Sequence, residues 1–157
     1  MLTGMCGVSI SLAADAGLKT DPTFNVVMVY EDVPTGSRAM KTYGHIVDQI
    51  GREVAFNNEM WKFDALRQPE VKELAAAQAA QADMIIISAH GNRELPQAVR
   101  SWIDLWLTRQ RTGARALVEL SDTASESSSR ATASHSYLKQ VAEEGQMDFF
   151  SHSFDAP

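Results

Sequence analysis

The segment "DMIIISAHGNRELPQAVRSWIDLWL", residues 83–107, holds a strand, a polar loop and a helix in succession. Residues 83–89 form the most hydrophobic run of the chain, as expected of a strand that is covered on both faces. Pro96 suits the start of a helix, and one apolar stripe then follows at spacings of three and four. Its members are Val99, Trp102, Ile103, Trp106 and Leu107. The segment therefore predicts a central parallel strand with a helix that crosses back over the sheet.

The same alternation of strand and helix extends in both directions from this segment. Further strands are predicted at 24–30, 53–63, 114–120 and 147–154, with the one at 53–63 on a sheet edge because its polarity is mixed. Helices are predicted from Ser37 to a stop at Gly51, from Pro69 onward, and before Gly145. Strands and helices in this alternation predict an α/β fold: a three-layer, doubly wound, five-stranded parallel sheet with the flavodoxin-like order 2-1-3-4-5.

Length and composition predict one domain over residues 24–157, preceded by a flexible N-terminal extension over residues 1–23. The net charge of -6, with no basic cluster, argues against nucleic acid as a partner. No apolar run approaches the roughly 20 residues that a membrane-spanning helix needs. Cys6 is the only cysteine, which excludes an intrachain disulfide and agrees with a cytoplasmic location.

A candidate site is expected beyond the carboxyl ends of the strands, where the strand order reverses. Three loops should meet there, at 31–38, 90–95 and 121–130. In the first loop, Thr35, Gly36 and Ser37 predict a tight turn whose backbone N–H groups hold an anion at a helix N-terminus. Arg38 would add a phosphate contact. The same residues also suit a plain turn and helix cap, so both interpretations stay open.

The first two loops resemble those of the flavodoxin family. "TGSR" at Thr35–Arg38 is similar to the family's first loop, and "SAHGNRELPQAVRSWIDLWL" at Ser88–Leu107 is similar in rhythm to its second. The resemblance implies a domain that binds FMN or another small phosphate-bearing ligand at the carboxyl ends of the first and third strands. The residues that would hold it are Thr35, Gly36, Ser37, Arg38, His90, Gly91, Asn92 and Ser121. His90 departs from the family, which has a stacking aromatic there.

A second resemblance is to phosphoacceptor receiver domains. Glu31 and Asp32 match the acidic pair that holds Mg²⁺ after the first strand of a receiver, and carboxylates are suitable ligands for that ion. "SAHG" replaces the expected acceptor aspartate, which implies a degenerate receiver: a non-enzymatic signalling or scaffold domain with a protein partner. A homodimer stays open under either hypothesis.

Enzymatic activity stays open as well. The residue types of a hydrolytic triad are present in Ser88, His90, His135, Asp122 and Asp32, but no Gly-x-Ser-x-Gly motif accompanies them.

Overall fold

The computed structural model describes residues 23–51, 54–91, 94–110, 113–122 and 129–154. Residues 1–22, nearly all of the predicted N-terminal extension, lie outside the described residues. The helices and strands in chain order are β2 (Thr23–Tyr30), α2 (Val33–Ile50), β3 (Ala55–Lys62), the 3₁₀ helix η1 (Phe63–Arg67), α3 (Pro69–Gln81), β4 (Met84–Ser88), α4 (Gln97–Leu107), β5 (Ala116–Asp122), α5 (Ser129–Glu144) and β6 (Asp148–Phe154).

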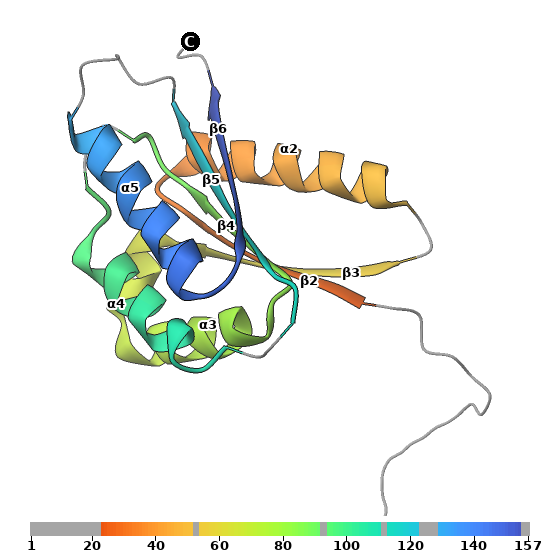
Figure 1. The fold of residues 1–157 in the computed structure, drawn as a ribbon, viewed down its shortest axis with the longest axis horizontal. Coiled ribbons are helices and arrows are strands. Elements are labelled where there is room, and N and C mark those ends of the chain that lie inside the picture. The colour runs from red at the N-terminus through yellow and green to blue at the C-terminus, as the bar shows by residue number, and fades with distance from the viewer. Residues whose placement is uncertain (1–22, 52–53, 92–93, 111–112, 123–128, 155–157) are drawn as a thin grey trace, which may run out of the picture.

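The five strands form one sheet in the order β3-β2-β4-β5-β6, and every neighbouring pair is parallel. This is the predicted order 2-1-3-4-5, with β3 at an edge and β4 in the middle (Figure 1). The order reverses between β2 and β4, which lie side by side with Tyr30 opposite Ser88 at their carboxyl ends. The loops that follow these two strands therefore start next to each other.

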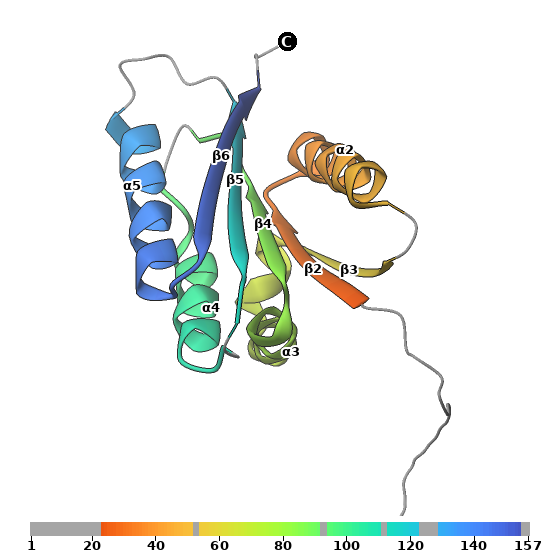
Figure 2. The same cartoon turned by 45° about the vertical axis from the view of Figure 1, so that its right-hand side comes forward.

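The helices cover the two faces of the sheet unequally. Helices α3, α4 and α5 lie together on one face, and α2 lies on the other (Figure 2). Alternate residues of the strands point to opposite faces. On the α2 side, the buried strand residues pack with Ala39; they are Val26, Met28, Ile86, Val118 and Leu120.

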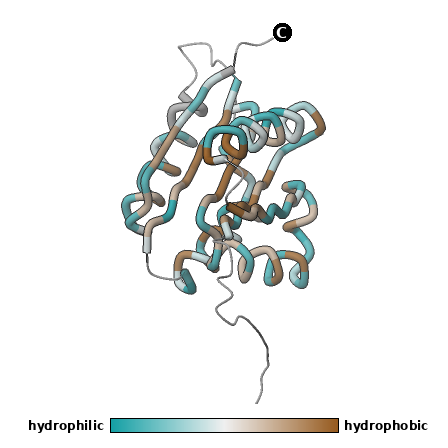
Figure 3. Tube along the Cα trace, turned by 90° about the vertical axis from the view of Figure 1, so that its right-hand side faces the viewer, coloured by the Kyte–Doolittle hydropathy of each residue, from teal (hydrophilic) through white to brown (hydrophobic). Residues whose placement is uncertain are grey.

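The larger core lies between the sheet and α3 to α5. Trp102, Ile103 and Trp106 of α4 are fully buried there, which confirms the predicted apolar stripe. The strand residues that face them include Val27, Ile85 and Leu117. Hydrophobic residues accordingly gather along the strands in the middle of the molecule (Figure 3).

Two helix starts differ from the prediction. Helix α2 begins at Val33 rather than Ser37, so the predicted turn over residues 35–37 is wrong: these residues form part of the first helical turns. Helix α5 begins at Ser129, within the loop predicted over residues 121–130. It is helical because Ser134, Leu138 and Val141, at spacings of four and three, turn one face toward the core.

Candidate functional site

The start of α2 is fixed by a capping box around Asp32. The Asp32 carboxylate accepts a hydrogen bond from the backbone N–H of Thr35 at 3.2 Å. The Thr35 hydroxyl oxygen in turn accepts from the backbone N–H groups of Glu31 and Asp32, each at 2.9 Å. Pro34 suits the first turn, where its missing N–H needs no partner. These contacts explain why the helix starts four residues earlier than predicted.

The capping box also uses backbone N–H groups that were predicted to hold an anion. Thr35 and Gly36 are buried, and the N–H of Gly36 donates to the carbonyl of Asp32 at 2.9 Å. The backbone N–H groups of both residues are therefore used within the helix start. Ser37 is exposed on α2, and Arg38 pairs with Asp122 at the end of β5. The "TGSR" residues thus form a capped helix in which two predicted phosphate donors already have acceptors.

Gly36 is required by the close approach of an aromatic ring. A Cβ atom built at Gly36 would lie 2.9 Å from Cδ2 of Tyr30, whereas one built at Gly44 of the same helix would meet no atom within 4 Å. We therefore expect Gly36→Ala to lower the free energy of unfolding by about 1 kcal/mol, since overpacking outweighs the gain in helix propensity. Gly44→Ala should raise it by about 0.5 to 1 kcal/mol. Urea denaturation of both variants measures this, and equal effects would contradict it.

Four titratable side chains form a hydrogen-bonded series at this edge of the sheet. A guanidinium N–H of Arg38 donates to Oδ1 of Asp122 at the end of β5. The other carboxylate oxygen of Asp122 lies 2.8 Å from Nδ1 of His90, and Nε2 of His90 lies 2.7 Å from Oδ2 of Asp32. This hydrogen-bonded series, Arg38–Asp122–His90–Asp32, thus connects the ends of β5, β4 and β2 with the start of α2.

His90 has a carboxylate on each ring nitrogen. A neutral imidazole carries one N–H, so only the imidazolium form can donate to both Asp32 and Asp122. Although burial acts in the opposite direction, hydrogen bonds from His90 and from the backbone of Thr35 hold the pKa of Asp32 below its usual value of 3.8. Asp32 is therefore a carboxylate at neutral pH, and it acts here as a helix cap and as a partner of His90.

Other contacts bring the predicted residues of the second and third loops together. One carboxylate oxygen of Glu31 accepts from the backbone N–H of His90 at 3.0 Å. Gly91 has a φ of 83°, and a Cβ there would lie 3.0 Å from Cβ of Ser121. His90, Gly91 and Ser121 are therefore neighbours, as expected, whereas Asn92 lies outside the described residues.

Ser88 does not pair with a histidine. Its buried hydroxyl donates to the backbone carbonyl of Thr35 at 2.8 Å, which ties β4 to α2. A nucleophilic serine needs a base that accepts its proton, and a carbonyl cannot do this. Ser88 and His90 thus do not form the nucleophile and base of a hydrolytic triad.

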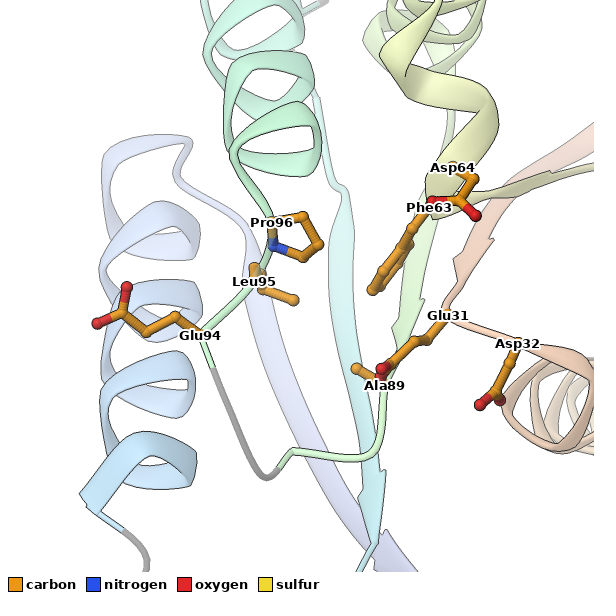
Figure 4. A pocket seen from close by; sticks show the side chains of 8 residues that line it. All are labelled: Glu31, Asp32, Phe63, Asp64, Ala89, Glu94, Leu95 and Pro96. Carbon is orange, nitrogen blue, oxygen red and sulfur yellow. The ribbon is translucent and has the colours of Figure 1, made fainter.

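A cavity of about 430 Å³ lies at the carboxyl ends of β2 and β4. Eight residues line it: Glu31, Asp32, Phe63, Asp64, Ala89, Glu94, Leu95 and Pro96. Figure 4 shows the Phe63 ring, the Leu95 side chain and the Glu31 carboxylate turned toward a common space, whereas Glu94 points away from it. The lining thus combines an apolar floor with carboxylates and contains no basic side chain among these eight residues.

Phe63 and Asp64 are site residues that the sequence analysis missed. They begin η1, directly after the edge strand β3, and so reach the same end of the sheet as the other loops. Their position after a predicted strand was a usable signal, because the carboxyl ends of parallel strands lie along one edge.

Glu31 and Asp32 are the candidate Mg²⁺ ligands under the receiver resemblance. Within the described part of the chain, no group of three or more His, Cys, Asp or Glu side chains is arranged to hold a metal ion. Asp32 and Glu31 already accept hydrogen bonds from the His90 ring and backbone. Carboxylates beside an apolar surface can instead attract an organic cation, such as an ammonium group attached to an apolar body.

No protein-family model matches the chain, and no curated protein matches it. The resemblances to flavodoxins and to receivers therefore stay predictions, although the strand order is the one that both imply. None of the described helices is long and apolar enough to cross a membrane.

Proposed function

We propose that this domain binds a small ligand in the cavity at the carboxyl ends of β2 and β4, and that the ligand carries a positive charge on an apolar body. The observation that supports this is the lining of that cavity, which combines Glu31, Asp32 and Asp64 with Phe63 and Leu95. Its position agrees with the general rule for open α/β sheets, whose ligands bind where the strand order reverses.

The carboxylates of the cavity favour a positively charged ligand. A cation roughly 4 Å from one carboxylate gains about 1 to 4 kcal/mol, depending on how well water screens the pair. An anion at the same distance is disfavoured by a similar amount. The chain as a whole, with a net charge of -6, adds to the same preference.

An apolar part of the ligand would contact Phe63, Leu95 and Pro96. Phe63 and Leu95 are each only 5% exposed, so both side chains are held in place by the core. A cation above the face of an aromatic ring gains about 0.5 to 2 kcal/mol. A ring or short aliphatic chain on the ligand would cover Leu95 and Pro96.

FMN and other phosphate-bearing ligands are the prediction of the flavodoxin resemblance. Two features of the site weigh against them. The N–H groups of Thr35 and Gly36 have acceptors within α2, and the neighbouring cavity carries carboxylates. FMN is therefore the contrasting ligand in the experiment that follows.

The second hypothesis, a receiver-like signalling or scaffold domain, makes a different prediction. It requires Mg²⁺ at Glu31 and Asp32, and a folded state that binds Mg²⁺ is stabilised by mass action. The hydrogen bonds that these two carboxylates accept from His90 compete with metal binding. We therefore expect millimolar Mg²⁺ to leave the melting temperature unchanged.

Thermal melts with matched ligands test the proposal. Benzylamine is expected to raise the melting temperature progressively, with the logarithmic dependence on concentration of a ligand that binds the folded state, whereas benzyl alcohol and benzoate, which have the same ring, should not. Asp64→Asn should weaken benzylamine binding about twofold to fivefold, as expected for one solvent-accessible charge pair. Asp48→Asn, a change at an exposed aspartate of α2, is the matched control and should leave binding unchanged.

The same melts separate the hypotheses. Stabilisation by FMN alone would contradict the cationic ligand and support the flavodoxin resemblance. Stabilisation by Mg²⁺ alone would support the receiver-like scaffold instead.

A cytoplasmic location is part of this proposal and is supported by the lone Cys6, which fits a reducing compartment.

Light scattering of the purified chain tests whether it forms a homodimer.

A further inference from the structure

A second cavity, of about 220 Å³, lies between α4 and α5. Its lining residues are Glu94, Leu95, Arg100, Ala133, Ser134 and Tyr137. The two helices lie side by side on the same face of the sheet in Figures 1 and 2. Leu95 and Glu94 also line the 430 Å³ cavity at the carboxyl ends of β2 and β4, here called the acidic cavity. This segment therefore separates a cavity lined by carboxylates from one that contains Arg100.

Arg100 is the distinctive side chain of this second cavity. Its Nε atom is buried and has no hydrogen-bond partner, and no described residue forms an ion pair with its guanidinium group. A buried N–H without an acceptor costs free energy, because the hydrogen bond that water would make is lost. Arg100 also lines the cavity, so an acceptor that enters it meets a cationic side chain.

Tyr137 supplies a second donor on the facing helix. Burial raises the pKa of its phenol, and the carboxylate of Asp104 acts in the same direction. The hydroxyl therefore stays protonated at neutral pH and can donate a hydrogen bond to an oxygen. Arg100 and Tyr137 both line the same small space, so one ligand can meet both.

We infer that the cavity between α4 and α5 binds a small carboxylate, with Arg100 as its charge partner and Tyr137 as a hydrogen-bond donor. A guanidinium group presents paired N–H donors that match the two oxygens of a carboxylate. The volume is below the roughly 300 Å³ at which pockets for drug-sized ligands begin, so the carboxylate should carry only a short side chain. Leu95 and Ala133 would contact that chain.

Glu94 opposes the ligand from the edge of the cavity. Its side chain is exposed and points away from the acidic cavity (Figure 4). Like charges repel, so Glu94→Gln should strengthen binding of a carboxylate. A strengthening here distinguishes this site from the acidic cavity, whose cationic ligand would gain nothing from the loss of a carboxylate.

Calorimetric titration with sodium butyrate tests the inference. Butyrate should bind, whereas butyramide, which has the same shape without the charge, and sodium chloride at equal ionic strength should not. Arg100→Gln should weaken butyrate binding about tenfold or more, and Tyr137→Phe about threefold. Arg67→Gln, at an exposed arginine of η1, is the matched control and should leave the affinity unchanged.

Arg100→Lys covers the case in which Arg100→Gln fails to fold, since it keeps the charge and loses the paired donors. It should still weaken butyrate binding several-fold. Butyramide binding as tightly as butyrate, equal butyrate affinity in all variants, or the absence of butyrate binding would each overturn the inference. Because Asp64→Asn should not alter butyrate binding, failure here is distinct from failure of the proposed cation site.

Discussion

Arg115→Met is expected to lower the free energy of unfolding by about 2 to 4 kcal/mol, since it removes charge-assisted hydrogen bonds at the buried end of a helix. Arg115 is only 4% exposed. Its Nε donates to the carbonyl of Ala82 at 2.8 Å, and its terminal nitrogens donate to the carbonyl of Ala79 and the side chain of Gln110. Its guanidinium carbon lies 5.7 Å from the ring centre of Trp106.

The effect is large because helix α3 ends there. The last carbonyls of a helix lack the donors of a following turn, and Arg115 donates to those of Ala79 and Ala82. The Ala79 carbonyl also accepts from the backbone N–H of Ala82 at 3.1 Å. Methionine keeps the apolar contact with Trp106 and leaves both carbonyls without this donor. Urea denaturation monitored by tryptophan fluorescence measures the loss.

Arg109→Gln is the matched control for Arg115→Met. Arg109 also donates to a partner, the Glu73 carboxylate, but both side chains are well exposed. Exposed ion pairs are screened by water and contribute little. No measurable change is expected for Arg109→Gln, and a similar loss in both variants would contradict the role given to burial.

His90→Ala is expected to lower the free energy of unfolding by about 2 kcal/mol, because two hydrogen bonds to carboxylates are lost and the two carboxylates then face each other without a donor between them. The His90 side chain is 25% exposed, so water replaces it only in part. His45→Ala, at an exposed histidine of α2, controls for the loss of an imidazole as such. Equal stability of the two variants would contradict the network.

The pH dependence of this effect follows from Asp32. Its pKa is lowered in the folded protein, so its contribution to stability is present above the ordinary value of 3.8 and is lost as the pH falls through the lowered pKa. In His90→Ala, the pKa of Asp32 should rise toward 3.8. Carbon-detected NMR titration of the Asp32 carboxyl measures both values, and an unchanged pKa would contradict the contact with His90.

The architecture could be predicted because it depends on periodic patterns. The run of Ile85, Ile86 and Ile87 between polar loops is typical of a central strand, and the stripe through Trp102 and Trp106 is typical of a helix on a sheet. Both patterns are local, so they can be recognised without the rest of the structure.

The start of α2 was missed although a local signal was present. Asp32 followed by Pro34 and Thr35 suits an N-cap with a proline in the first turn and a capping box. The small residues Gly36 and Ser37 suggested a turn instead. The packing of Gly36 against Tyr30, which explains that glycine, is visible only in the structure.

The contacts that define the site could not be predicted. Asp122 is separated from Arg38 by 84 residues and from His90 by 32, and no periodic pattern relates such positions. The same holds for buried Glu119, which accepts from His135 at 2.7 Å and from Ser151 at 3.0 Å. Sequence reasoning placed the loops at the right edge of the sheet and could not show which charges neutralise one another.

The most direct test of the cationic-ligand proposal is a titration of the ¹⁵N-labelled chain with benzylamine, followed by amide NMR. The predicted result is saturable shifts at Phe63, Asp64, Ala89 and Leu95, with the amides of β6 unaffected. Benzylamine shifts that are absent, or that are spread evenly over the surface, would contradict the proposal. The proposal would also be contradicted if FMN shifted the amides of Thr35–Arg38 while benzylamine left the amides of the cavity unchanged.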